Sequence, residues 1–103
     1  MSLLPQPARA DIDFIALMHA LADPVRLRMV GLLADGRERT CLGVVEALGM
    51  NASTMSHHFR VLRESGVTST RKTGRVRYVT LRRDDLDARF PGVLDAAIGA
   101  VPA

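Results

Sequence analysis

The stretch from Asn51 to Ser65, closed by Gly66, constrains the fold of this chain more than any other. On a helix it places Met55, Phe59 and Leu62 within about 60° of one another. The opposite face presents hydrogen-bonding side chains, namely Ser53, His57, Arg60 and Glu64. Short polar groups of this kind can approach base edges and phosphate oxygens in a DNA groove. The pattern predicts a recognition helix, although an ordinary amphipathic surface helix with a serine or threonine cap would look the same.

Two helices are expected near the start of the chain. Residues 11–22 carry an apolar stripe that is wider than one packing contact needs, so a second partner is implied. Asp23 and Pro24 are typical of a helix start, with the aspartate as N-cap and the proline at the first helical position. The helix that follows, residues 25–34, is apolar on all sides. It is therefore predicted to be sandwiched between neighbours.

A third, short helix is expected from Cys41 to Leu48, with Thr40 as its N-cap and Gly49 as its stop. A short helix, a glycine-containing break and a longer helix with a polar outer face form the helix-turn-helix arrangement. Beyond the recognition stretch the apolar period changes from 3.6 to 2. Residues 67–72 and 76–81 therefore predict a β-hairpin with a glycine-containing loop.

The end of the chain is expected to be helical but interrupted. Residues 83–90 begin a helix, which Pro91 and Gly92 should break or offset. A short apolar helix follows, and it is expected to pack on a second subunit together with the first helix. The residues predicted at that dimer interface are Phe14, Leu17, Met18, Leu94 and Ile98. The predicted fold class is mainly α with a β-hairpin, a winged helix-turn-helix of four helices, two strands and one terminal helix.

Domain organisation and charge point in the same direction. Residues 1–10 contain two prolines and no periodicity, which predicts a flexible tail, and residues 11–103 are expected to form one DNA-binding and dimerisation domain. Between Arg60 and Arg83 there are eight basic residues and one acid, a net charge of +7, whereas the rest of the chain carries −4. Such asymmetry favours a polyanion-binding face. An arginine-rich composition is the alternative, but it explains the residue type better than the clustering.

Composition limits where in the cell the protein is expected to act. The chain has no basic region followed by an apolar run near its start, and no segment reaches the roughly 18 to 20 apolar residues of a membrane span. A single cysteine, Cys41, fits a reducing compartment. We expect a cytoplasmic protein without a membrane partner. An aromatic content of 4% means that the core must be aliphatic and rich in methionine.

Four segments carry a family likeness: residues 20–29 (ALADPVRLRM), 46–49 (EALG), 53–66 (STMSHHFRVLRESG) and 71–78 (RKTGRVRY). In these segments the chain resembles the bacterial ArsR/SmtB family of winged-helix repressors, with a likeness that runs from about Asp11 to Ile98. The resemblance implies a homodimer that binds a palindromic DNA operator and leaves it when an effector arrives. It also implies roles for matching residues. Those that enter the major groove would be Ser53, Thr54, Ser56, His57 and Arg60, and those of the wing Arg71, Lys72, Arg75 and Arg77.

The chain departs from the family at its metal sites. Metal-sensing members carry a Cys-x-Cys pair at the start of the third helix, where this chain has Thr40 and Leu42 on either side of Cys41. A second family site uses aspartate and histidine along the terminal helix, and that region has aspartates but no histidine. One cysteine cannot supply the soft ligands of a tight site. No metal and no cofactor are therefore expected.

Two residues have alternative interpretations. Beside Arg37 and Arg39, Cys41 could have a lowered thiol pKa and sense oxidants, but a lone cysteine next to leucine is more often a small apolar packing residue. His58 lies nearer the apolar stripe than His57 does. It is interpreted as a packed or capping histidine and not as a DNA contact.

The function predicted from these patterns is a dimeric, sequence-specific DNA-binding transcriptional regulator, a repressor whose effector the sequence does not identify. A winged-helix protein-interaction module without operator specificity is the alternative. A basic wing and a hydroxyl-lined helix argue against it, because a protein-binding version should expose apolar residues there. An enzyme is disfavoured because Ser56 and His57 lie about 100° apart on the helix and no acid orients the histidine.

Overall fold

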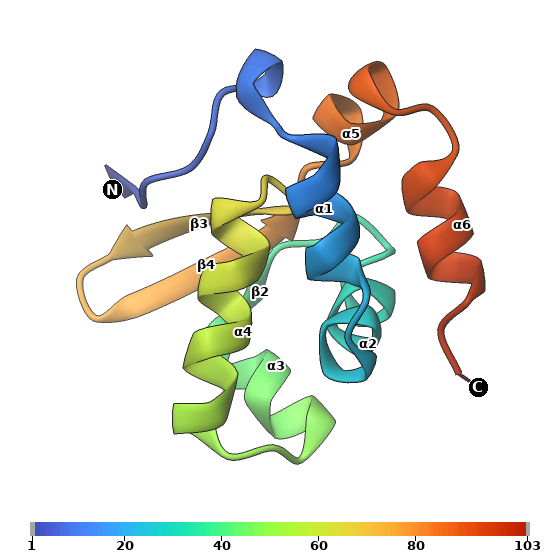
Figure 1. Ribbon diagram of the computed structural model, residues 1–103. Helices are drawn as coiled ribbons and strands as arrows, with labels where there is room; N and C mark the ends of the chain where they lie inside the picture. Colours follow the sequence, from blue (N-terminus) through green and yellow to red (C-terminus); the bar gives the residue numbers. More distant parts are fainter. Residues whose placement is uncertain (1, 103) are drawn as a thin grey trace.

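Residues 2–102 are described by the computed structural model, in which a cluster of helices carries a small projecting sheet, the wing (Figure 1). In chain order the elements are β1 (Ser2–Leu3), the 3-10 turn η1 (Arg9–Asp11), α1 (Phe14–Leu21), α2 (Pro24–Leu32), β2 (Arg39–Thr40), α3 (Cys41–Leu48), α4 (Ala52–Glu64), β3 (Thr68–Thr73), β4 (Val76–Leu81), α5 (Arg83–Arg89) and α6 (Val93–Gly99). The predicted winged helix-turn-helix is confirmed. The observed order adds β1, β2 and a second terminal helix to the predicted one.

The helices begin where the cap residues are placed. Asp23 Oδ2 accepts a hydrogen bond from the Arg26 N–H at 2.9 Å, and Pro24 is the first residue of α2. Thr40 Oγ1 accepts from the Gly43 N–H at 3.0 Å and starts α3. Each cap satisfies a backbone N–H that has no partner inside the helix. These two predicted starts are confirmed.

The sheet is antiparallel in the order β1-β3-β4-β2. The hairpin runs from the pair Thr68 and Leu81 to the pair Thr73 and Val76, next to its loop. The two outer strands are only two residues long, too short for any periodicity in the sequence. They form because the edges of a hairpin carry unpaired N–H and C=O groups that a passing segment can satisfy.

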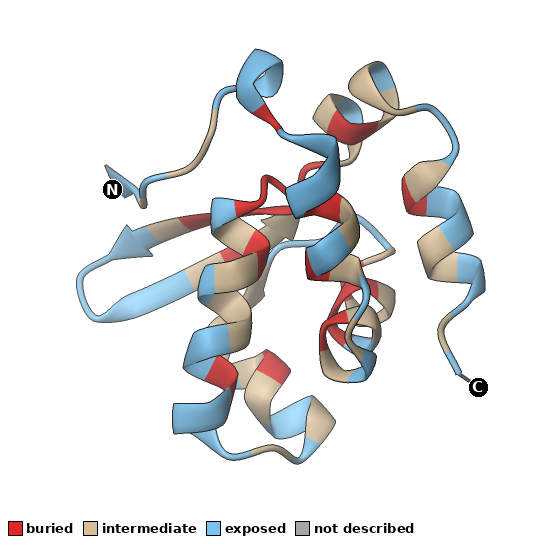
Figure 2. Ribbon diagram, in the orientation of Figure 1, coloured by how far each residue is buried: buried red, intermediate tan, exposed pale blue. Residues whose placement is uncertain are grey.

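The core lies where α1, α2 and α4 meet the base of the sheet (Figure 2). Leu17, Met29, Met55 and Leu62 are fully buried, and α2 contacts α1, α3, α4 and α6. The prediction that α2 is sandwiched is confirmed. Among the described residues no aromatic side chain is fully buried, as expected of an aliphatic, methionine-containing core.

The interruption predicted at Pro91 and Gly92 is confirmed, and it divides the single terminal helix of the predicted element order into two helices. α5 ends at Arg89, and α6 begins at Val93 after Gly92, whose φ of 86° lies in the left-handed region. Proline cannot continue the hydrogen-bond ladder of α5, and glycine allows the chain to turn sharply. α6 consequently packs against α2 as well as α5.

The N-terminal segment has defined contacts. The Leu4 N–H donates to the Thr70 carbonyl at 2.9 Å, and Ser69 Oγ donates to Gln6 Oε1 at 2.8 Å. The flexibility predicted for residues 1–10 stays a prediction, as does the extent of the domain over 11–103. Met1 of the first range and Ala103 of the second lie outside the described residues. Over residues 2–102, no helix is both long enough and apolar enough to cross a bilayer.

Candidate nucleic-acid interface

A short turn aims α4 away from α3. Gly49 ends α3 with φ of 64°, a left-handed conformation that glycine adopts without strain. Asn51 then caps α4, because its Oδ1 accepts from the Ser53 N–H at 2.8 Å. With Met55 and Leu62 anchored in the core, the opposite face of α4 is left to solvent.

The far end of α4 is held by a glycine. Gly66 has φ of 88°, and a Cβ at this position would lie 2.7 Å from Cγ1 of Ile12. Any side chain there would clash with the segment that leads into α1. Gly66 therefore sets both the end of α4 and the close packing behind it.

The outer face of α4 carries the predicted recognition residues, all of them exposed: Ser53, Thr54, Ser56, His57 and Arg60. Their intramolecular contacts are few and solvated. Arg60 Nε lies 3.5 Å from Glu64 Oε1, and its Nη2 lies 3.3 Å from His57 Nδ1. Exposed contacts of this type contribute little to stability. They can be exchanged for contacts to DNA at small cost.

Two serine hydroxyls on this face already donate a hydrogen bond. Ser56 Oγ donates to the Ala52 carbonyl at 3.1 Å, and Ser53 Oγ donates to Asn51 Oδ1. In this arrangement the oxygens remain acceptors, so they suit donor groups such as the exocyclic amines of bases.

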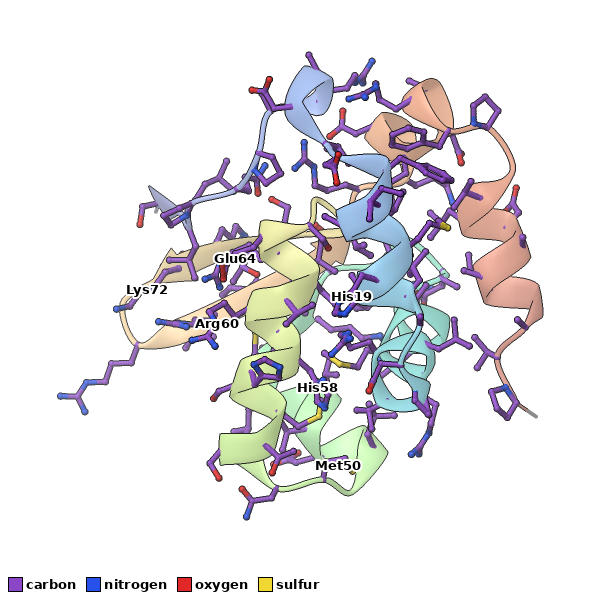
Figure 3. The ribbon with its side chains drawn as sticks, viewed as in Figure 1. His19, Met50, His58, Arg60, Glu64 and Lys72 are labelled. Carbon is purple, nitrogen blue, oxygen red and sulfur yellow. The ribbon has the colours of Figure 1, made fainter. Side chains whose placement is uncertain are left out.

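His58 points the other way, toward α2 (Figure 3). Its side chain is only 11% exposed, Nδ1 lies 3.2 Å from Arg26 Nη1 and 3.9 Å from Asp23 Oδ2. Burial lowers the pKa of His58, and the neighbouring Asp23 carboxylate opposes this effect. The interpretation of His58 as a packed residue is confirmed.

Arg26 was not singled out by the sequence, yet it connects α1 to α4. It is 7% exposed, its Nε donates to the Ala20 carbonyl at 2.7 Å, and its Nη2 donates to the His19 carbonyl at 3.4 Å. The guanidinium thereby pairs with two carbonyls at the C-terminal end of α1 and also contacts the His58 ring on α4. A charged residue inside an apolar helix was the available signal, because such a residue is rarely buried without partners.

The wing residues fall into two kinds. Arg71 forms a two-point ion pair with Glu38, with Nε to Oε2 at 2.7 Å and Nη2 to Oε1 at 2.6 Å, and it stacks over Tyr78 at 4.1 Å. These hydrogen bonds hold the pKa of Glu38 below its usual value. The side chains of the other predicted wing residues, Lys72, Arg75 and Arg77, are exposed and have no hydrogen bond or ion pair to any described residue.

The basic cluster of the sequence is therefore smaller in space than along the chain. Arg82 pairs with Asp85 at 2.9 Å, and Arg83 pairs with Asp95 at 2.9 Å, both at the α5 end of the molecule. These two arginines and Arg71 are neutralised by carboxylates. On the face of α4 and the wing, Arg60 has only its exposed contact to Glu64, and the cations without a carboxylate partner among the described residues are Arg63, Lys72, Arg75 and Arg77.

The residues predicted at the dimer interface are not all available to a partner. Leu17 and Leu94 are buried in the core of the protomer, and the interface role predicted for them stays a prediction. Helical periodicity identified the apolar stripe but not which of its residues face inward. Phe14 is exposed and stacks on Phe90 with ring centroids 5.1 Å apart, while Met18 and Ile98 are half-buried.

Cys41 lies at the start of α3, and burial raises the pKa of its thiol although Arg77 and Arg63 oppose the rise. The lowered pKa that the oxidation-sensor interpretation requires is thus not found, whereas a packing role fits. Within residues 2–102 no three His, Cys, Asp or Glu side chains gather in a group that could hold a metal ion.

Comparison with known proteins agrees with this geometry. A family model described as a helix-turn-helix domain matches residues 21–71. The uncharacterized HTH-type transcriptional regulator YceK of Bacillus subtilis (strain 168) is 40% identical over 80 residues, which cover 77% of this chain and 80% of that protein. The arsenical resistance operon repressor of Staphylococcus xylosus is 31% identical over 73% of this chain and 71% of its own length.

A solved structure is similar as well. The solution structure of Mb0332 from Mycobacterium bovis superimposes with a TM-score of 0.68 at 30% identity and covers 85% of this chain and 81% of that one. It is described as the homodimeric winged helix-turn-helix DNA-binding domain of a possible ArsR-family transcriptional regulator.

An exposed polar helix on a helix-turn-helix, with a cationic hairpin beside it, defines a winged-helix DNA-binding protein. The similar proteins identify the family within this class of DNA-binding proteins. The chain belongs to the ArsR/SmtB family of transcriptional regulators, and it is a DNA-binding regulator and not an enzyme.

Proposed function

We propose that this protein is a homodimeric, sequence-specific transcriptional repressor that acts in the cytoplasm on a palindromic operator. One observation carries the proposal. The recognition face of α4, defined by Ser53, Thr54, Ser56, His57 and Arg60, is exposed and polar, and it lies beside wing cations that have no carboxylate partner among the described residues.

In this proposal α4 enters the major groove and reads bases, while the wing contacts the backbone. Arg60 has the reach and the two-point geometry for a guanine, and the serine oxygens accept from adenine or cytosine amines. Lys72, Arg75 and Arg77 bind phosphates. Arg71 holds the wing to the Glu38 loop and contributes to DNA binding mainly by positioning its neighbours.

The dimer forms through α1 and α6. An open apolar groove of about 420 Å³ lies between α1, α2 and α6, with Met18, Leu27, Val93 and Ala97 among its lining residues. Homodimeric Mb0332 supports a second copy of the chain as the occupant. Phe14, Met18 and Ile98 are proposed to face the partner, with Ile15, which is 72% exposed, beside them. The two recognition helices would then lie about 34–36 Å apart.

The repressor is proposed to lack the Cys-x-Cys metal site of the family. Thr40 is occupied as the cap of α3, and Leu42 is an exposed hydrocarbon, so neither position offers a thiolate. Release from the operator would then depend on another effector.

The test is fluorescence anisotropy with DNA from upstream of the protein's own gene and a scrambled duplex, at fixed salt, with excess zinc and with chelator. We expect specific binding that zinc does not change. Equal affinity for both duplexes would contradict the repressor function and favour a protein-interaction module. Release by zinc would contradict the missing metal site. Sedimentation at micromolar concentration should give a dimer, and a monomer would contradict the proposed interface.

A further inference from the structure

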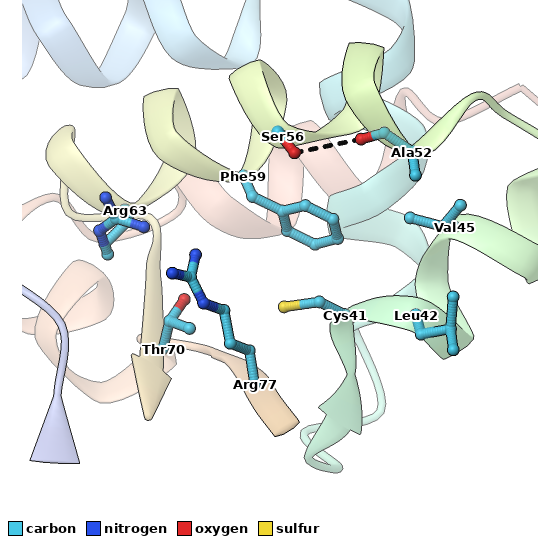
Figure 4. A pocket seen from close by; sticks show the side chains of 9 residues that line it. All are labelled: Cys41, Leu42, Val45, Ala52, Ser56, Phe59, Arg63, Thr70 and Arg77. Carbon is cyan, nitrogen blue, oxygen red and sulfur yellow. Dashed lines mark hydrogen bonds between the residues drawn. The ribbon is translucent and has the colours of Figure 1, made fainter. Parts of the chain in front are cut away.

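A pocket of about 210 Å³ lies behind the recognition face, between α3, α4 and the strands of the wing (Figure 4). One side is apolar and is formed by Cys41, Leu42, Val45 and Phe59. The other side is formed by Thr70, Arg63 and Arg77. The pocket thus joins a hydrocarbon wall to a cationic one.

The hydroxyl of Thr70 has no hydrogen-bond partner in the described structure. Thr70 is 2% exposed, and Figure 4 shows its oxygen directed toward the guanidinium groups of the pocket and not toward β4. Thr68 Oγ1 is also unpaired, but among the two hydroxyls only that of Thr70 lines this pocket, where it is free to hydrogen-bond a ligand.

The arginines on this wall have spare donors. The Arg77 side chain has no hydrogen bond or ion pair to any residue in the described range, and Arg63 uses its Nε for the Pro5 carbonyl at 3.2 Å. Both lie close enough to Cys41 for their charge to act on its thiol. Two guanidinium groups and one hydroxyl in such an arrangement match a carboxylate, which accepts up to four hydrogen bonds.

The size of the pocket limits the ligand. A cavity of about 150 Å³ accommodates benzene, so about 210 Å³ has room for one ring with a small polar group. We propose that this pocket binds a small carboxylate with a compact apolar body, of the size of benzoate. The carboxylate binds Arg77, Arg63 and the Thr70 hydroxyl, and the body lies against Phe59, Val45 and Leu42.

Such a ligand would oppose DNA binding, a consequence that rests on the proposed function. It would hold the Arg77 guanidinium at the pocket and away from DNA phosphates, and would add contacts that bridge α3, α4 and β4. Because binding free energies are reciprocal, a ligand that competes for Arg77 weakens the operator complex, and the operator weakens ligand binding by the same factor.

The binding test uses benzoate on the DNA-free protein, followed by two-dimensional amide NMR and by the rate at which Cys41 reacts with a thiol reagent. Cys41 is the only cysteine of the chain, so this rate reports on the pocket alone. We expect shifts around Cys41, Phe59 and Thr70, and a slower reaction of Cys41. Benzamide, which has the same shape without the charge, should bind about tenfold more weakly, as should phosphate, which has charge without the body.

Variants separate the site from folding. Thr70→Val removes the unpaired hydroxyl without changing shape, so we expect unchanged or higher stability together with weaker benzoate binding. Arg77→Met should weaken benzoate binding about tenfold. The matched control is Arg75→Met, at an exposed wing arginine that does not line this pocket, and it should bind as the parent does. Equal binding of benzoate and benzamide, equal binding by the two arginine variants, or no shift with benzoate at about 10 mM would overturn the proposal.

The regulatory consequence has its own measurement. Saturating benzoate should raise the Kd of the parent protein for its operator. It should not raise the Kd of Arg77→Met, when the two proteins are compared at equal concentrations of DNA-binding-competent protein. If benzoate binds but leaves the Kd unchanged, the effector role is overturned. If the parent protein shows no preference for the operator, the proposed function is contradicted. The NMR result on the DNA-free protein still shows whether the pocket binds benzoate.

Discussion

The two ends of this molecule use arginine in opposite ways. At the α5 end each guanidinium has a partner: Arg9 and Arg82 share Asp85 at 2.6 and 2.9 Å, Arg83 reaches Asp87 and Asp95, and Arg89 donates to the Arg9 carbonyl. On the face of α4 and the wing, Arg60 has only a solvated contact, and Arg75 and Arg77 have no partner among the described residues.

The difference shows that partners, and not residue type, decide what an arginine does. A guanidinium whose charge is matched by a carboxylate stabilises the fold and adds little to the attraction for DNA. An unmatched one contributes little to folding and attracts phosphate. Substitutions at the paired end should therefore lower stability, whereas substitutions at the unpaired end should lower DNA affinity.

The largest effect is expected at the paired end from Arg82→Met. The Arg82 side chain is 6% exposed. It forms an ion pair with Asp85 and donates a hydrogen bond to the Pro7 carbonyl at 2.7 Å. The loss should lower the free energy of unfolding by about 3 kcal/mol, since Asp85 and the carbonyl lose a buried donor. Urea denaturation measures it. Unchanged stability, or lower DNA affinity of the folded protein, would contradict the distinction between paired and unpaired arginines.

At the unpaired end Arg60→Ala should do the reverse. Operator preference should fall by about 1–3 kcal/mol at one base pair, because a two-point contact to a base is lost. The free energy of unfolding should change by less than about 0.5 kcal/mol, as for other surface sites. Anisotropy against single base-pair variants of the operator gives the first value and denaturation the second. Arg28→Ala, at an exposed arginine of α2, is the control.

A smaller effect is expected from Arg75→Ala at the wing loop. It should weaken binding to all DNA sequences alike and reduce the slope of log K against log salt by about one, because one phosphate contact is lost. A salt titration on operator and scrambled duplexes checks this. A change confined to the operator would instead mean that the wing reads bases.

The smallest expected effect is the pH dependence of stability that arises from His58, the residue through which α4 contacts Arg26 and Asp23 of the interior. His58 has a folded pKa below its unfolded value, which is about 6.5. Its contribution to stability is present above that value and is lost as pH falls through the folded pKa, because the unfolded chain then binds more protons. The groups that face it are Asp23, Arg26 and His57.

The free energy of unfolding should accordingly decrease between about pH 7 and pH 5, and His58→Gln should make this decrease shallower. His57→Gln, at the neighbouring exposed position, removes one of the charges that lower the pKa of His58, so it should change the slope less than His58→Gln does. Identical slopes for parent and His58→Gln would show that the His58 contact does not depend on protonation.

Local signals were sufficient for most of the fold. The caps at Asp23 and Thr40 are bonds between residues three apart, and the hairpin follows from a period of two, so both could be predicted. The outer face of α4 was predictable for the same reason. The short strands β1 and β2 were not, since their pairing depends on segments that are distant in the chain.

Periodicity and capping act within a few residues of chain, so the helix-turn-helix, the wing and the residues that α4 turns outward could be predicted from local patterns. Long-range packing, in contrast, sets which cations lack a carboxylate partner, which apolar residues stay exposed, and that Thr70 and Arg77 share a pocket with Cys41. The reason is distance. Arg71 and Glu38 are separated by 33 residues in the sequence, and Arg82 and Pro7 by 75. Local sequence patterns cannot predict contacts between residues that are so far apart along the chain.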